Sequence, residues 1–477
     1  MMTKRGMLRA GLWVLALVVL LIGAGGGFAL SLHHKFNPDP PRNDFPIPAN
    51  ALETQQQDIE QFSRLLAMDR SFSPAARAAG QRQIAELKAE RVPLDSGRFR
   101  VVLMGIAALA DNGHTSIELN QDTWPNYVPL RVMWFADGLY VLRVKSPYAD
   151  LLGARVDNID GRPALQVLAA LKQLHGGADG WRRIHAALYI QSPEILYGAG
   201  LGSRPDQTTW TFRLPDGTET TRILAGEVPG VGEPHALMTR WLSPQGMKGE
   251  ARGWRALFAT DAGLPLSLRD FNSTLRRAWI DHSCTLFIQL KAIQDADGLR
   301  IDDFLKATTD EMGAHPPCNV ILDMRFNTGG DYTKAARFAS HLPALLPPSG
   351  RIYILTGPQT FSAAITTTAF VKQAAGSRAI ILGEPLGDRL AFYGEGNTGC
   401  LPHAKLCVHY ATGMHDYAHP CHDWDKCYWL NWLFPVRVRS LQPDETIEMT
   451  FADYAARRDP VFDRAVALAE PRAANRE

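Results

Sequence analysis

The 477-residue sequence lacks several features that would place it directly in a functional class. Its formal charge is only +1, because 50 Lys and Arg residues face 49 Asp and Glu residues. This balance gives no reason to expect a nucleic acid as partner. No internal repeat occurs, and no low-complexity block is found outside the N-terminus. The apolar fraction of 46% is ordinary for a globular protein, and the length corresponds to about two or three domains.

Long hydrophobic runs are also missing, apart from one at the N-terminus. Ala10–Leu32 is uncharged over 23 residues, which is long enough to span a bilayer. The basic flank Lys4-Arg5 predicts a cytoplasmic N-terminus with the rest of the chain translocated. A cleaved signal peptide is the alternative, since Gly27-Phe28-Ala29 resembles a small-residue cleavage site. The length of the run favours a retained transmembrane helix, with the bulk of the chain in the periplasm or outside the cell.

Cysteine is scarce, but its six residues fit a non-cytosolic location. Two of them precede expected strands, and these thiols would meet at one sheet end if the strands are parallel neighbours. The other four form two pairs that are close in sequence, one of them flanking a possible hairpin. Six cysteines allow 15 pairings, and proximity favours Cys284–Cys318, Cys400–Cys407 and Cys421–Cys427.

A strand, a turn and a helix surround Ser362. Arg351–Thr356 is a short β-branched run typical of a buried strand, and a Gly-Pro turn follows it. Ser362 then opens an Ala/Thr-rich helical segment, with Gly376 at the position of a C-terminal cap. The serine would therefore lie at the positive end of a helix, where a developing oxyanion is stabilised.

A second unit of the same kind lies just upstream. Asn319–Met324 is an expected strand, and Asp331–Leu342 is an expected helix. The loop between them contains Gly329 and Gly330, whose backbone freedom allows amides to point at a ligand. Two adjacent units, one with a hydroxyl and one with bare amides, indicate an acyl-transfer site. An ordinary helix cap beside a glycine turn remains the alternative.

The rest of the chain also shows alternating helices and strands, which predicts an α/β layer structure. Glu53–Glu90 has the spacing of two amphipathic helices. Strand patterns occupy Val128–Val144, and a hairpin signal lies within Thr208–Leu224. Asp453–Ala467 is mainly helical in character. A histidine, His114, lies in a turn rather than on an apolar helix face, which makes it a candidate base.

Four motifs together resemble the S41 serine peptidases, which include C-terminal processing peptidases, the tricorn core and interphotoreceptor retinoid-binding repeats. They are VILDMRFNTGG, ILTGPQTFSAAI, IILGEP and QPDETIEMTFADYAARRDPVFDRAV, in the family's order. The resemblance implies a crotonase/ClpP-like α/β catalytic domain preceded by a degenerate PDZ-like domain. The domains expected are 1–44 as anchor and spacer, 45–125 as a helical region carrying His114, 126–230 as the PDZ-like domain, 231–270 as linker or insertion, and 271–477 as the catalytic domain.

The resemblance also assigns roles to individual residues. Ser362 matches the nucleophile, while Gly329 or Gly330 and the amide of Ala363 match the oxyanion-hole donors. The processing peptidases place a lysine where this chain has Gly387. The following residues are Asp388 and Arg389, and an arginine does not deprotonate at useful pH.

The tricorn and retinoid-binding branch uses a histidine instead, and this branch fits the sequence better. Its Asp-x-His-Thr-like motif resembles Asp111-Asn112-Gly113-His114-Thr115 with one extra residue, which makes His114 the expected base. The serine and glutamate that support this histidine in tricorn-like enzymes are replaced by Gly113 and by the run Arg437–Ser440. Asp111 and Asp423 are candidates to orient His114.

A metal or cofactor is not expected. The segment 400–427 gathers histidines, aspartates and four cysteines, but their spacing fits no closed zinc pattern, and the cysteines suit disulfides better. Four aromatic residues in and after this segment form either a core lid or a substrate wall, with core packing favoured: Trp424, Tyr428, Trp429 and Trp432.

Two functions follow from these observations. The first is a membrane-anchored, extracytoplasmic serine peptidase that hydrolyses peptide bonds through an acyl-enzyme, with a peptide or protein as substrate. The second is a non-catalytic scaffold that binds a ligand or protein on the same fold. Contact between the Ser362 hydroxyl and the His114 ring is the geometric condition that separates them.

Overall fold

The computed structural model describes residues 25–118, 125–228, 241–246, 250 and 253–470. The first fifteen residues of the expected membrane span, 10–24, lie outside this part of the chain, and 25–36 form the first described helix. Over the described ranges, no helix combines the length and apolar character needed to cross a bilayer.

The main sheet contains the two strand–loop–helix units. Its strand order is β18-β13-β12-β11-β10-β9, and neighbouring strands are parallel except for the antiparallel pair β9 and β10. The strands are β9 (Leu275–Trp279), β10 (Thr285–Leu290), β11 (Asn319–Asp323), β12 (Ile352–Thr356), β13 (Ala379–Gly383) and β18 (Glu445–Thr446). Four of them, β10 to β13, are almost wholly buried, as their continuous apolar runs require when both faces of a sheet are covered.

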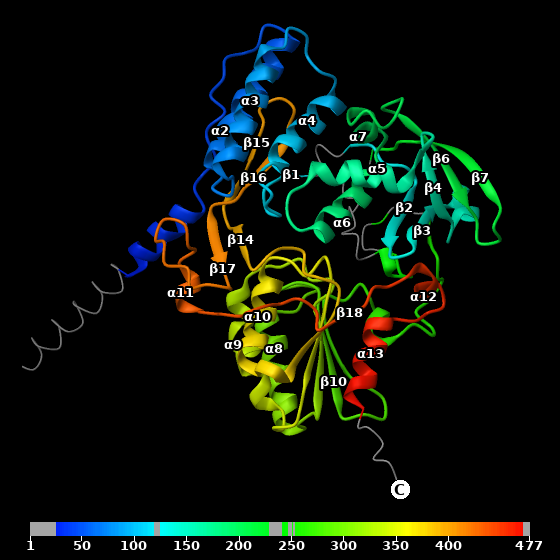
Figure 1. Ribbon diagram of the computed structural model, residues 1–477, viewed down its shortest axis with the longest axis vertical. Helices are drawn as coiled ribbons and strands as arrows, with labels where there is room; N and C mark the ends of the chain where they lie inside the picture. The colour runs from blue at the N-terminus through cyan, green and yellow to red at the C-terminus, as the bar shows by residue number, and fades with distance from the viewer. Residues whose placement is uncertain (1–24, 119–124, 229–240, 247–249, 251–252, 471–477) are drawn as a thin grey trace, which may run out of the picture.

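Helices cover both faces of this sheet (Figure 1). One face packs against α8 (Ile301–Ala314), α9 (Tyr332–His341) and α10 (Ala363–Ala375), and the other packs against α13 (Pro460–Ala469). The helix expected over Asp453–Ala467 is interrupted, with a short α12 (Phe451–Ala455) before α13. The break is explained by Pro460, which begins α13, and by Asp459, whose side chain caps it.

Helices at the N-terminal end form a second layer with a small sheet. The two expected amphipathic helices are present as α2 (Ala51–Met68) and α3 (Pro74–Ala89). The third, α4 (Ser96–Ala108), showed no helical period because apolar residues occur on most of its surface and it is buried nearly all round. The small sheet has the order β1-β16-β15, with β1 (Ser116–Glu118), β15 (Asn397–Cys400) and β16 (Cys407–Tyr410), and β14 (Ala391–Gly394) pairs with β17 (Gly413–Asp416).

A seven-stranded sheet fills the remaining part of the molecule, in the region where a PDZ-like domain is expected. Its strands are β2 (Leu130–Phe135), β3 (Gly138–Lys145), β4 (Arg155–Ile159), β5 (Arg162–Pro163), β6 (Gln207–Arg213), β7 (Glu219–Ala225) and β8 (Trp254–Ala256). Three helices accompany them, α5 (Ala164–Leu171), α6 (Asp179–Tyr189) and α7 (Pro193–Gly198), while the short α11 (Leu430–Leu433) lies near the N-terminal helix. Part of the expected linker 231–270 is packed, since β8 pairs with β3.

All three cysteine pairs favoured by proximity are present as disulfides. Cys284 and Cys318 directly precede the parallel neighbours β10 and β11, so their Cα atoms lie 5.3 Å apart. Cys400 and Cys407 face each other across the β15–β16 hairpin.

Candidate active site

Ser362 lies at the carboxyl edge of the parallel sheet, where β12 gives way to α10. Its backbone has φ 54° and ψ −126°, a region that residues with a side chain rarely occupy. Such a conformation costs on the order of 1–3 kcal/mol and is characteristic of functional turns between a strand and a helix. It places the hydroxyl at the N-terminal end of α10, where the helix dipole is positive. The side chain is partly exposed, so a ligand can reach it.

His114 comes to this serine from a distant part of the chain. Its Nε2 lies 3.0 Å from Oγ of Ser362, although 248 positions separate the two residues in sequence. This distance is within hydrogen-bond range. The contact between the Ser362 hydroxyl and the His114 ring, which was the condition for a peptidase, is therefore present.

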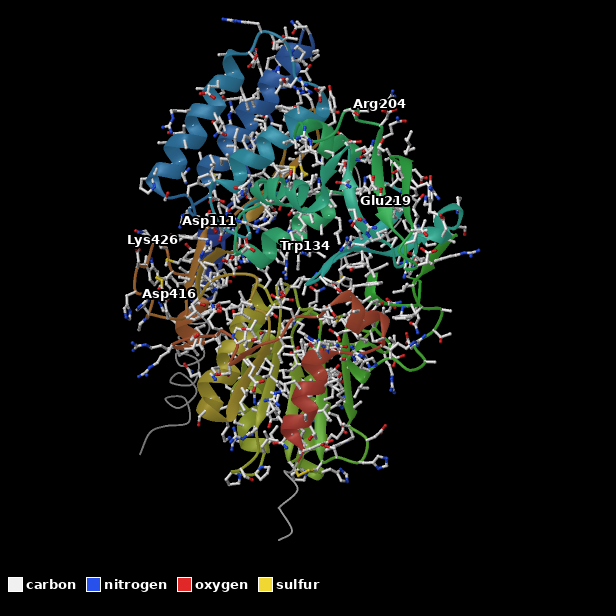
Figure 2. The ribbon with its side chains drawn as sticks, turned by 45° about the vertical axis from the view of Figure 1, so that its right-hand side comes forward. Asp111, Trp134, Arg204, Glu219, Asp416 and Lys426 are labelled. Carbon is white, nitrogen blue, oxygen red and sulfur yellow. A yellow bond between two sulfur atoms is a disulfide. The ribbon has the colours of Figure 1, made fainter. Side chains whose placement is uncertain are left out.

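Charged and polar contacts hold the loop that carries His114. The carboxylate of Asp111 accepts hydrogen bonds from Arg182 of α6 and, at 2.7 Å, from Arg389 beyond β13. His409 of β16 contacts the backbone carbonyl of His114 at 2.8 Å. Because these partners come from three separate elements, the position of the loop depends on the whole tertiary structure. Figure 2 shows Asp111 at the level where the upper elements meet the main sheet.

Aromatic rings hold the imidazole itself. The ring of His114 stacks between Phe361 (centroids 4.4 Å apart) and Phe392 (5.5 Å). The column continues to Trp181 on one side, at 4.0 Å from Phe361, and to His415 on the other, at 5.0 Å from Phe392. Each such pair contributes roughly 0.5–1.5 kcal/mol beyond its buried area. We call these five rings the aromatic column, and it determines the plane of the imidazole.

Within the described part of the chain, no acidic side chain is hydrogen-bonded to the ring of His114. Its Nδ1 is buried and has no hydrogen-bond partner among the described residues. Asp111 uses its carboxylate on the two arginines, and Asp423 accepts from nearby backbone amides in its own loop. Burial lowers the pKa of His114 well below its usual value, and nearby His409 and His415 lower it further. The imidazole is therefore neutral at pH 7 and can accept a proton.

The glycine loop after β11 lies directly against Ser362. A Cβ atom at Gly329 would lie 2.6 Å from Cβ of Ser362, so only glycine allows this approach. The amide of Gly329 donates to Oδ1 of Asn327 at 3.0 Å and is thus already engaged. Gly330 is exposed, and Ala363 begins α10. The amides of these two residues remain as candidates to bind an oxyanion.

Close packing explains why glycine occupies positions 113 and 387, where the related peptidases have a serine and a lysine. A Cβ atom at Gly113 would lie 2.6 Å from the ring of Phe361, and one at Gly387 would lie 2.4 Å from the carbonyl oxygen of Pro358. The aromatic column therefore leaves no room for a serine before His114, and the backbone of Pro358 leaves none for a lysine side chain at 387. Sequence comparison showed that these groups were missing, but not why.

Asp388 is a site residue whose role sequence reasoning missed. It is buried, and its carboxylate accepts weakly from the amide of Gly113, with the two atoms 3.4 Å apart. Burial raises its pKa from 3.8 to about 6, and the backbone amide and charge of Arg389 oppose that rise. A buried carboxylate beside a histidine loop is a candidate site residue. In the sequence, its only sign was its place directly after Gly387, where the processing peptidases have a lysine.

The segment 400–427 contains β16, β17 and two of the three disulfides. Among these described residues, no group of three His, Cys, Asp or Glu side chains is arranged to hold a metal ion. Tyr428 is buried, as expected for core packing, but the same expectation is wrong for Trp424 and Trp432, which are exposed and stack on each other at 4.8 Å.

Comparison with known proteins gives matches only at the level of structure. No family model matches the sequence, and no curated protein matches it. Mature CPAF matches with a TM-score of 0.54 and 14% identity over 88% of this chain and 96% of the other. The complex of mature CPAF with lactacystin matches with a TM-score of 0.53 and 14% identity, covering 88% of this chain and 98% of the other.

The match to a photosystem II D1 C-terminal processing protease covers 84% of this chain and 94% of the other at 11% identity, but its TM-score of 0.36 is too low to indicate a shared fold. The similarity to mature CPAF extends over nearly all of both chains, and the chain therefore has the fold of that protein.

Proposed function

We propose that this protein is a serine peptidase that hydrolyses peptide bonds through an acyl-enzyme, with Ser362 as nucleophile and His114 as base. The observation that carries the proposal is the 3.0 Å contact between Oγ of Ser362 and Nε2 of His114. A strained serine at a helix N-terminus, a neutral imidazole and a glycine loop in van der Waals contact with the serine are the parts that acyl transfer requires.

The proposed reaction begins when Nε2 of His114 takes the hydroxyl proton as Oγ of Ser362 attacks the substrate carbonyl. The amides of Gly330 and Ala363 then stabilise the oxyanion. His114 returns the proton to the leaving amine, and an acyl-serine remains. A water molecule, deprotonated by His114, releases the acid and regenerates the serine.

The aromatic column takes over the orienting role that a carboxylate has in other triads. With the proton on Nδ1, Nε2 carries the lone pair that faces Ser362, which is the tautomer that the reaction needs. The unpartnered Nδ1–H costs on the order of 1–3 kcal/mol of stability. It also leaves the imidazolium without an acidic partner, so the chemical step is expected to be slower than with a complete triad.

The same unpartnered Nδ1 favours the second candidate, a binding scaffold on this fold. In that case, ligand binding would survive the loss of Ser362, and no covalent adduct would form. The two candidates therefore make opposite predictions for one experiment.

The test is active-site labelling of the full-length protein with a fluorophosphonate, followed by peptide mapping. We expect an adduct on Ser362 that is lost in Ser362→Ala and reduced at least about 10³-fold in rate in His114→Ala. Ser340→Ala and His341→Ala, at exposed positions of α9, are the matched controls and should label normally. Absence of the adduct in the folded wild-type protein would favour the scaffold.

We further propose that the N-terminal run Ala10–Leu32 is a retained anchor that holds the protein at the outer face of an inner membrane. Exposed apolar side chains on the helix 25–36 (Phe28, Leu30) and in the neighbouring segment (Trp424, Trp432) support this proposal. Phe28 stacks on Trp424 with centroids 6.1 Å apart, and Trp424 continues the stack to Trp432. Trp is enriched where membrane proteins meet the lipid interface. In Figure 1, α11 lies beside this helix.

The anchor is tested by N-terminal sequencing of the protein recovered from the membrane fraction of a bacterial host. A chain that starts before Ala10 and resists carbonate extraction is the expected result. A mature N-terminus shortly after Ala29 would instead identify a cleaved signal peptide.

A further inference from the structure

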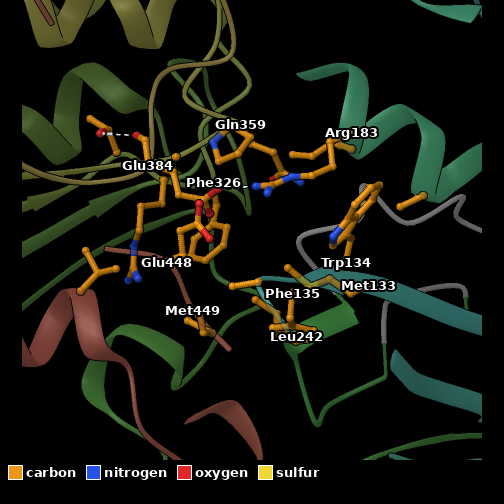
Figure 3. Close-up of a pocket in the computed structure, with 18 of the residues that line it drawn as sticks. Met133, Trp134, Phe135, Arg183, Leu242, Phe326, Gln359, Glu384, Glu448 and Met449 are labelled. Atoms are coloured by element: carbon orange, nitrogen blue, oxygen red, sulfur yellow. Dashed lines mark hydrogen bonds and ion pairs between the residues drawn. The ribbon is translucent and has the colours of Figure 1, made fainter. Parts of the chain in front are cut away.

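A pocket lies between the main sheet and the seven-stranded sheet (Figure 3). Its volume is about 100 Å³. One wall is the loop Gly357–Gln359, which leads into Ser362, and another is Phe326, which precedes the glycine loop. The opposite walls come from β2 and α6. The segments that lead into Ser362 and into the glycine loop thus also form part of the pocket wall.

The pocket is close enough to Ser362 to receive part of a bound peptide. Gln359 precedes Ser362 by three residues, so their Cα atoms are at most about 11 Å apart. An extended peptide advances about 3.3 Å per residue. The pocket is therefore within reach of a side chain one to three residues from the scissile bond.

The walls are mainly apolar. Met133, Phe135, Leu242 and Met449 lie around the lower part of the pocket in Figure 3, with Phe326 above them. Several of these side chains are only partly buried, which leaves apolar surface available for a ligand. Covering such surface with an aliphatic group is favourable by about 0.8 kcal/mol for each buried CH₂ group.

Three of the four charged residues that line the pocket have partners within the protein, and the fourth, Glu448, is exposed. Arg183 of α6 forms an ion pair with Glu384 at the end of β13. Arg325 is paired with Asp323 and Asp459, each at 2.8 Å. Because the two arginines already have partners, they offer no free positive charge to a ligand, and the exposed carboxylate of Glu448 disfavours an acidic one.

One polar atom in the wall lacks a partner. Gln359 is only 7% exposed, and its Oε1 has no hydrogen-bond partner among the described residues. A buried acceptor without a donor costs on the order of 1–3 kcal/mol. A backbone N–H of a bound peptide would supply the missing donor. This combination of an apolar space and one free acceptor is typical of a pocket that recognises a peptide side chain together with its backbone.

We propose that this pocket is a specificity subsite that accepts an aliphatic side chain of the peptide substrate, with Oε1 of Gln359 accepting a substrate backbone N–H. This inference rests on the proposed peptidase function and adds the class of substrate. A cavity of about 150 Å³ holds a benzene molecule. The smaller volume here fits the side chains of Val, Leu, Ile or Met better than those of Phe, Tyr or Trp.

The first test uses binding, so that it does not depend on catalysis. The full-length Ser362→Ala protein is incubated with a peptide library, and bound peptides are identified by mass spectrometry. We expect one position to be enriched in aliphatic residues. A branched aliphatic residue adds about three carbon groups to alanine, and at about 0.8 kcal/mol each this predicts a preference of roughly 50-fold.

Two variants connect this preference to the pocket. Ala136 is exposed at the mouth of the pocket, so Ala136→Phe should fill it without disturbing the core and should abolish the aliphatic preference. Ala314→Phe makes the same change at an exposed site on α8, away from the pocket, and should preserve it. Met449→Ala should enlarge the pocket and admit aromatic side chains.

The outcomes separate this proposal from the peptidase proposal. Peptide binding without an aliphatic position, or a preference that Ala136→Phe leaves intact, would overturn the assignment of the pocket. An aliphatic preference that depends on the pocket, in a wild-type protein that neither labels nor cleaves, would support the subsite and refute the peptidase. Failure of the Ser362→Ala protein to bind any peptide would overturn the subsite, whereas the labelling of Ser362 in the wild-type protein decides the peptidase proposal separately.

Discussion

Replacement of Asp388 by asparagine should stabilise the protein at neutral pH but not at acidic pH. Asp388 is buried beside Gly113, and burial raises its pKa from 3.8 to about 6. A group whose pKa is higher in the folded state binds its proton more tightly there than in the unfolded chain. The folded state is thus favoured while Asp388 is protonated, and this advantage disappears as the pH rises through 6.

The magnitude follows from the two pKa values. The difference between 3.8 and about 6 corresponds to about 3 kcal/mol, since each tenfold change in proton affinity is worth about 1.4 kcal/mol. Below pH 3.8 the carboxyl is protonated in both states, and no difference arises from it. The advantage of Asp388→Asn should therefore grow by about 2.5 kcal/mol between pH 4 and pH 7.5.

The assay is urea unfolding of the wild-type and Asp388→Asn proteins across this pH range, with the disulfides intact. A difference in unfolding free energy that is the same at every pH can reflect the different hydrogen bonds of asparagine. Only the change of this difference with pH reports the titration of Asp388. Asp303→Asn makes the same chemical change at an exposed position on α8 and provides the matched control. A difference in unfolding free energy that is independent of pH would refute the reasoning.

Three further predictions concern the histidine loop. In the Asp388→Asn protein, the acidic limb of kcat/KM should lie well below pH 6.5, because burial lowers the pKa of His114; a limb at or above 6.5 would contradict this. Arg389→Ala should lower kcat/KM for peptide hydrolysis by about tenfold or more while changing stability by no more than about 1 kcal/mol. Arg464→Ala is the control, because it removes a similarly exposed ion pair far from the loop, and it should lower kcat/KM by much less than tenfold. Gly113→Ser should destabilise the protein by about 1–3 kcal/mol through its clash with the neighbouring ring and should not raise activity, as unfolding and rate measurements would show.

The local architecture of the serine unit was predictable because it depends on neighbouring residues. A β-branched run makes a strand, a Gly-Pro turn ends it, and Ala/Thr-rich sequence makes the helix that follows. The structure has these elements as β12 and α10, within one residue of their expected limits. The pairing of Cys284 with Cys318 was also predictable, because adjacent parallel strands place residues that precede them side by side.

The sequence was less informative where packing in three dimensions determined the outcome. The helix α4 showed no periodicity because it is buried nearly all round. The exposure of Trp424 and Trp432 depends on neighbours that are distant in sequence, so composition could not reveal it.

The candidate site shows the same division between local and tertiary information. Motif order identified Ser362, the glycine loop and His114, since each belongs to a short segment with its own pattern. The sequence also showed that the supporting serine, lysine and carboxylate are missing. It offered Asp111 and Asp423 as candidates to orient His114, but the structure has their carboxylates on other partners.

Only the tertiary structure determined what holds His114. Its ring lies in the aromatic column, and its loop is held through Asp111 by Arg182 and Arg389. These partners are up to 278 positions apart in the chain. Contacts of that kind carry no local sequence pattern, because the fold, and not the spacing along the chain, brings the side chains together.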